Sequence, residues 1–107
     1  MSEAPSFSAY LIFDFGEDHV AAERALGQVE QWVRAFKLHG QLLARARRTG
    51  EQTRLLVRLA FEEFEQLAFE RWLERIPREA VFAGAEVATV RPGDALFAWA
   101  CEWFGPV

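Results

Sequence analysis

The chain of 107 residues is 51% hydrophobic and 26% charged, with a net charge of −4. This predicts one globular domain whose core is large enough to need no metal or disulfide. The negative balance argues against a general nucleic-acid binder, which is usually basic. Cys101 is the only cysteine, no apolar run is long enough to span a membrane, and the first residues lack a signal-peptide pattern. We therefore expect a cytoplasmic protein.

The first part of the chain predicts a strand followed by a helix. Residues 1–6 are expected to be a loose start, and residues 7–15 are apolar on both faces, which is typical of a central strand. Apolar residues at three- and four-residue spacing predict a helix over residues 18–39. Asp18 is its expected N-cap, and Gly40 is expected at the C′ position just beyond its end.

Residues 41–61 predict a β-hairpin, against which the flanking segments are expected to pack. The apolar residues of its two strands share one face only if Ala46 lies opposite Leu55. The same register sets Arg47 opposite Arg54 on the other face, where like charges destabilise a strand pair by up to about 1 kcal/mol. The arginines therefore either extend into solvent or meet carboxylates, phosphate or a partner chain.

The second half of the chain predicts a helix, a strand and a terminal helix. Charges at its start and a proline after its end indicate a helix over residues 62–76. The pattern leaves residues 78–91 open, although residues 85–91 are expected to form the final strand. A helix over residues 94–104 is apolar on nearly every side, so it must pack on the domain or on another subunit. The expected buried face of the first of these helices consists of Phe64, Leu67, Ala68, Trp72, Leu73 and Ile76.

This order of elements predicts an α+β domain of the ferredoxin-like βαββαβ class, followed by the terminal helix. Both long helices are expected on one face of an antiparallel sheet, with Trp32 and Trp72 buried beneath it. The opposite face mixes apolar and charged residues and is expected to need a covering. Its expected apolar members are Tyr10, Ile12, Leu43, Leu56, Ala60 and Val87 or a neighbour. Its candidate anion- or partner-binding residues are Arg45, Arg47, Arg54, Arg58, Tyr10 and Asp14.

Three coverings of this face are considered. A second copy of the chain docks sheet to sheet, or the terminal helix folds across it, in its own subunit or swapped, with Trp99 and Trp103 near guanidinium groups. Nucleic acid stacking on Tyr10 is the weakest of the three, because the aromatic motifs of RNA-binding sheets are missing. The candidate interface residues are Leu96, Phe97, Trp99, Trp103 and Phe104.

No catalytic, cofactor or metal-binding motif is present in the sequence. His19 and His39 fall at opposite ends of one predicted helix, roughly 30 Å apart, and cannot share a site within one subunit. We therefore expect a small non-enzymatic domain that acts by homodimerisation or protein interaction, without metal or cofactor. One alternative is a dimeric binding protein or enzyme that holds a small acidic ligand with the arginines and uses Asp14 or His19 as base. A nucleic-acid-binding sheet is the second alternative.

Overall fold

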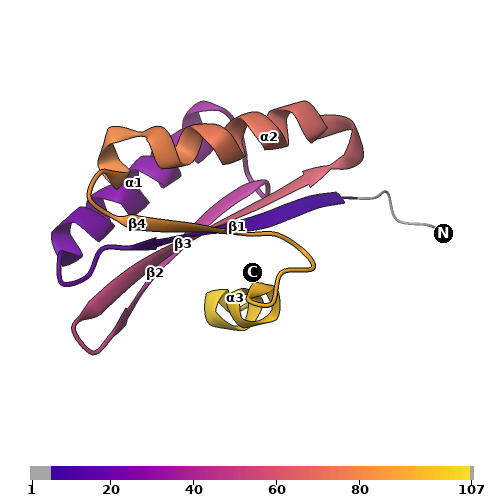
Figure 1. Cartoon of the computed structure of the whole chain (residues 1–107). Helices are drawn as coiled ribbons and strands as arrows, with labels where there is room; N and C mark the ends of the chain where they lie inside the picture. Colours follow the sequence, from indigo (N-terminus) through magenta and orange to yellow (C-terminus); the bar gives the residue numbers. More distant parts are fainter. Residues whose placement is uncertain (1–5, 107) are drawn as a thin grey trace.

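The computed structural model describes residues 6–106, which form a mixed α+β fold with one four-stranded antiparallel sheet and three α-helices (Figure 1). The strand order across the sheet is β2-β3-β1-β4. The loose start predicted for residues 1–6 lies outside the described residues except for Ser6, which begins the first strand. In chain order the strands and α-helices are β1 (Ser6–Asp14), α1 (His19–Ala35), β2 (Leu42–Thr49), β3 (Gln52–Glu62), α2 (Gln66–Arg75), β4 (Glu86–Val90) and α3 (Phe97–Phe104).

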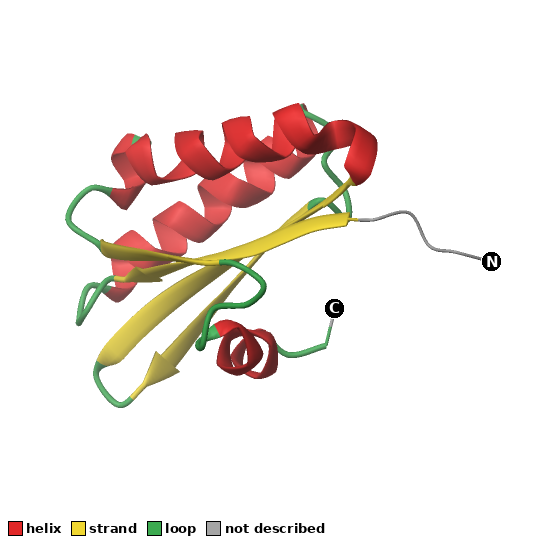
Figure 2. Ribbon diagram, turned by 45° about the vertical axis from the view of Figure 1, so that its right-hand side comes forward, coloured by secondary structure: helices red, strands yellow, loops and turns green. Residues whose placement is uncertain are grey.

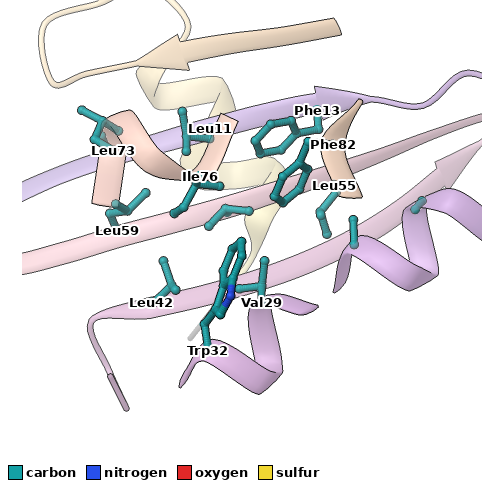
Figure 3. Packing of buried hydrophobic residues seen from close by; sticks show 14 of the residues in the cluster. Leu11, Phe13, Val29, Trp32, Leu42, Leu55, Leu59, Leu73, Ile76 and Phe82 are labelled. Carbon is teal, nitrogen blue, oxygen red and sulfur yellow. The ribbon is translucent and has the colours of Figure 1, made fainter. Parts of the chain in front are cut away.

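The sheet is covered on both faces. Helices α1 and α2 lie on one face, and the short helix α3 lies on the other (Figure 1, Figure 2). Successive residues of a strand point to opposite faces, so β1 sends Leu11 and Phe13 toward the two long helices and Tyr10 and Ile12 toward α3. Figure 3 shows the larger of the two cores, beneath α1 and α2. The central position predicted for β1 is confirmed, because β1 lies between β3 and β4 in the sheet.

The predicted register of the hairpin is confirmed. Ala46 pairs with Leu55 and Arg47 with Arg54 across β2 and β3. Thr49 and Gln52 form the last pair, so the turn has two residues, and its Gly50 has a φ of 63°. Positive φ at this position is what a tight turn between twisted strands requires.

Helix α1 begins as predicted but ends early. The carboxylate of Asp18 accepts a hydrogen bond from the backbone N–H of Ala21 at 3.0 Å, as an N-cap does. The helix ends at Ala35, and Lys37 takes the left-handed conformation with a φ of 54°. The next backbone N–H then bonds to a carbonyl of the last turn at 2.9 Å, which closes the helix end. The prediction of Gly40 at C′ is therefore wrong, because Gly40 lies in the following turn.

The buried face predicted for the second helix is partly wrong. A short 3-10 turn over Glu63–Glu65 precedes α2, so the first residues do not share the helical phase of the rest. Phe69 and Leu73 are buried, but Phe64 and Leu67 are 82% and 66% exposed. Phe64 lies in the 3-10 turn, which has a different number of residues per turn, whereas Leu67 lies within α2 on its exposed side.

The two tryptophans expected beneath the sheet differ in burial. Trp32 is buried in the main core, whereas Trp72 is only partly buried at its border. Their ring centroids lie 5.8 Å apart, and the guanidinium of Arg75 lies 4.9 Å from the Trp72 ring. Trp72 therefore lies at the border of the core, beneath the guanidinium of Arg75, and not inside the core.

The segment left open by the sequence contains two short 3-10 turns and the last strand. The turns are Ile76–Arg78 and Ala80–Phe82. Phe82 stacks on Phe13 with ring centroids 4.0 Å apart, which closes the core beside β4 (Figure 3). The strand predicted over residues 85–91 is present as β4.

Candidate functional site

The open face is the sheet face away from α1 and α2, and the register arranges its residues in rows across the strands. One row, here called the charged row, contains Glu86, Asp14, Arg54 and Arg47 in order from β4 to β2. Asp14 and Arg54 form an ion pair, with 3.5 Å between Oδ2 and Nε. This ion pair offsets the repulsion predicted between Arg47 and Arg54, because Arg54 has the carboxylate of Asp14 on its other side.

The neighbouring rows of the open face are mostly apolar and are covered by α3 of the same chain. Tyr10, Ile12 and Leu56 are buried there. Ala100 and Phe104 of α3 are buried against them. Val90, and not Val87, is the β4 valine on this face, because Val90 pairs with Tyr10 and is 2% exposed. The covering is thus the terminal helix within its own chain.

Two of the candidate arginines hold the end of α3. Arg45 donates from Nη1 to the carbonyl of Phe104 at 3.0 Å and from Nη2 to that of Pro106 at 2.5 Å. Its guanidinium also lies 5.0 Å from the Phe104 ring centroid. Gly105 permits this approach, since a Cβ there would lie 3.2 Å from Nη1 of Arg45.

Arg47, two residues further along β2, contacts the same end of α3. Its Nη1 donates to the carbonyl of Trp103 at 2.6 Å, and its guanidinium lies 5.0 Å from the Trp103 ring centroid. The last carbonyls of a helix have no partners within the helix and carry partial negative charge. Carbonyl oxygens at and just beyond the C-terminal end of α3 therefore occupy the two arginines in place of a free anion.

Tyr10 lies between the sheet and α3. Its ring centroid is 5.6 Å from that of Phe97 and 5.7 Å from that of Phe104. Burial raises the pKa of Tyr10 to about 12, the Cys101 thiol adds to the increase, and Arg58 opposes it. A phenol held neutral in this way is a packing and hydrogen-bonding group at physiological pH, and not a base. Arg58 lies directly opposite Tyr10 in the register, on the same face of the sheet.

The five candidate interface residues divide into two groups. Phe104 is buried, and Phe97 and Trp103 are partly buried against the open face. Leu96 and Trp99 remain 53% and 37% exposed. Trp99 stacks on Trp103 with ring centroids 5.9 Å apart.

A cavity of about 360 Å³ lies beside these exposed residues, between α3 and the β4 side of the sheet. It contains Asp14 and Arg54 from the candidate set and Glu86, which the sequence did not single out. The alternation of residues 85–91 indicates that every second side chain points to the same face of the sheet. It does not determine whether the set containing Glu86 or the other set lies on the face toward α3. The lining residues are Ile12, Asp14, Arg54, Glu86, Val87, Ala88, Leu96 and Trp99.

The two histidines lie outside this site. The ring of His19 is hydrogen-bonded through Nδ1 to the hydroxyl of Thr53, and His39 is exposed beyond the end of α1. Within residues 6–106, no three His, Cys, Asp or Glu side chains are grouped closely enough to hold a metal ion. In the same part of the chain no helix is long and apolar enough to cross a membrane.

Comparisons with known proteins bear on the fold alone. No protein-family model and no curated protein matches the chain. The de novo designed protein Foldit4 is similar in structure, with 17% identity, a TM-score of 0.61, and 79% of this chain and 93% of its own covered. An uncharacterised protein from Thermotoga maritima has 15% identity, covers 82% of this chain and 99% of its own, and has a TM-score of 0.42, which is too low to support an inference.

Proposed function

We propose that the chain is a small non-enzymatic interaction domain, on a ferredoxin-like βαββαβ scaffold, that self-associates through the edge of β4. The class is supported by the order of the elements and by the placement of α1 and α2 on one face. The proposed self-association is supported by the exposure of β4. Four of its five residues are exposed, and Val87 is 47% exposed. An uncovered strand edge offers unpaired backbone groups to another strand.

The other edge strand of the sheet, β2, is protected against pairing with another strand, so self-association is expected at β4. Strand β2 carries Arg45, Arg47 and Arg48, and charged side chains are a common means of blocking edge-to-edge pairing. Strand β4 has the sequence Glu-Val-Ala-Thr-Val, with one charge at its end and no proline or lysine. The β-branched residues in it favour strand pairing.

A second copy is the partner that fits this edge. Two β4 strands related by a two-fold axis pair antiparallel and join the two sheets into one, and two-fold dimers are the commonest homo-oligomers. A stable contact requires about 1,000 Å² of buried surface. The backbone ladder therefore needs side-chain packing around Val87 as well.

We do not extend the proposal to an acidic ligand on the arginines. Arg45 and Arg47 bond to carbonyls of α3, and Arg54 pairs with Asp14. An added anion would have to displace these contacts. We also propose a reducing cytoplasmic setting, supported by Cys101, which is exposed and outside any disulfide.

Thr89→Lys tests the proposal, with Thr49→Lys as the matched control on the opposite edge strand. Both threonines are exposed, and each variant adds one positive charge to a sheet edge. Sedimentation at micromolar concentration should show the wild type and the Thr49 variant at twice the 12.2 kDa mass of the chain, and the Thr89 variant at the single mass. A wild type found only as a 12.2 kDa species refutes the proposal.

A further inference from the structure

The cavity beside α3 combines an apolar floor, an aromatic wall and a charged end. Ile12 and Ala88 pair across β1 and β4 and form the floor. Leu96 and Trp99 form the wall, and both keep part of their surface exposed. Small-molecule sites are typically apolar clefts with a few polar groups that fix orientation. A flat apolar body fits the space between this floor and wall.

The charges at the end of the cavity do not balance. The two oxygens of Asp14 are both engaged, since Oδ1 accepts from the backbone N–H of Gly16 at 2.9 Å and Oδ2 pairs with Arg54 at 3.5 Å. Glu86 lies directly opposite Asp14 in the register and is exposed. In the described part of the chain, Glu86 makes no ion pair. Arg47 of the charged row does not line the cavity, so one arginine against two carboxylates leaves a single negative charge beside the apolar floor.

We propose that this cavity binds a small organic monocation, with an ammonium or amidinium head at Glu86 and a flat apolar body against Trp99. Charge complementarity selects the sign of the ligand, which is opposite to the acidic ligand expected from the arginines. The exposed part of the Trp99 ring offers a flat apolar surface on which the body of the ligand stacks. The volume of about 360 Å³ lies at the small end of the range for ligand sites, which favours a small molecule over a peptide. All of the residues that line the cavity belong to one chain.

Binding of 2-phenylethylammonium, measured by calorimetric titration and by NMR shifts of the residues lining the cavity, tests this proposal. Its matched probes are 2-phenylethanol and 3-phenylpropanoate, which present the same ring with a neutral and an anionic head. The ammonium ion should bind at least about tenfold more tightly than either, because only it gains a charge-assisted contact with Glu86. The NMR shifts should centre on Ala88 and Trp99.

Glu86→Gln should weaken binding of the ammonium ion by about tenfold and leave the neutral alcohol unaffected. Glu63→Gln is the matched control, since Glu63 is an exposed carboxylate in the turn before α2. Trp99→Ala should weaken binding of both probes. Equal binding of amine and alcohol, an unchanged affinity in Glu86→Gln, or no binding at millimolar amine each overturns the proposal. A lysine-rich peptide that binds where the amine does not overturns the assignment to a small molecule.

Discussion

Replacing Arg45 by Met should detach α3 from the sheet. The methionine side chain keeps most of the apolar stem of Arg45 but removes its contacts with the carbonyls of Phe104 and Pro106. It also removes the guanidinium that lies 5.0 Å from the Phe104 ring centroid. Together with the contacts of Arg47, they hold the C-terminal end of the helix.

The expected loss of stability follows from the exposure of Arg45. A hydrogen bond to a charged group contributes about 1.5–3 kcal/mol when buried, and less when water competes for the donor. Taking about 0.5–1 kcal/mol for each of the two bonds, of which one is exposed and the other part-buried, and a similar amount for the ring contact gives about 2 kcal/mol in all. Chemical unfolding should report this decrease in the free energy of unfolding.

Tyr10 provides a direct measure of α3 docking because it is the only tyrosine in the chain. Its pKa of about 12 results mainly from burial beneath α3. Tyrosinate absorbance, read immediately after a jump to high pH and before the chain unfolds, should therefore give a pKa near 12 for the wild type. In Arg45→Met the value should move toward the ordinary 10.0 of an exposed tyrosine.

Arg48→Met is the matched control, since Arg48 lies on the same strand and, among residues 6–106, donates only to the carbonyl of Gly50 in the turn. It should change neither the pKa of Tyr10 nor the stability by more than about 0.5 kcal/mol, the usual range for a surface substitution. If Arg45→Met behaves like this control, the arginine contacts do not hold α3, and the reasoning is refuted.

Two further predictions concern stability. Gly27→Ala should raise the free energy of unfolding by about 0.5–1 kcal/mol, because Gly27 lies inside α1 with open space where a Cβ would be; a melt that is unchanged or lower would contradict this. Stability should also fall as pH rises from 10 to 12, by up to about 1.4 kcal/mol per unit, because the unfolded chain ionises Tyr10 while the folded chain still keeps it neutral. In Tyr10→Phe this part of the alkaline decrease should be absent.

The parts of the fold that depend on neighbouring residues could be predicted from the sequence. The register of the hairpin follows from apolar alternation on both sides of one short turn, and the N-cap of α1 follows from Asp18 alone. The burial of Leu73 and Ile76 was predicted correctly, whereas the exposure of Phe64 could not be predicted, because the 3-10 turn that contains it leaves no distinct mark in the apolar spacing. The end of α1 was also misplaced, since Lys37 takes a conformation that usually selects glycine.

The candidate site was predictable only in its composition. The alternation of the strands brought Asp14 to the same face as the arginines, and the ion pair with Arg54 follows from it. Which of three coverings lies on that face depends on the path of residues 91–96, which the sequence pattern does not determine. The contacts of Arg45 and Arg47 with backbone carbonyls of α3 could not be foreseen either, because any residue type supplies such an acceptor.

The order in which the sheet pairs its strands has a consequence for folding kinetics. Strands β2 and β3 are joined by a two-residue turn, whereas β1 must find β4 across most of the chain, as the pair Tyr10 and Val90 shows. Local hairpins close within microseconds, and distant pairings are slower because more chain entropy is lost first. Substitutions at Gly50 should therefore slow folding, whereas those in α3 should mainly accelerate unfolding. Transition-state φ-values would accordingly be high in the hairpin and near zero in the helix that covers its far side.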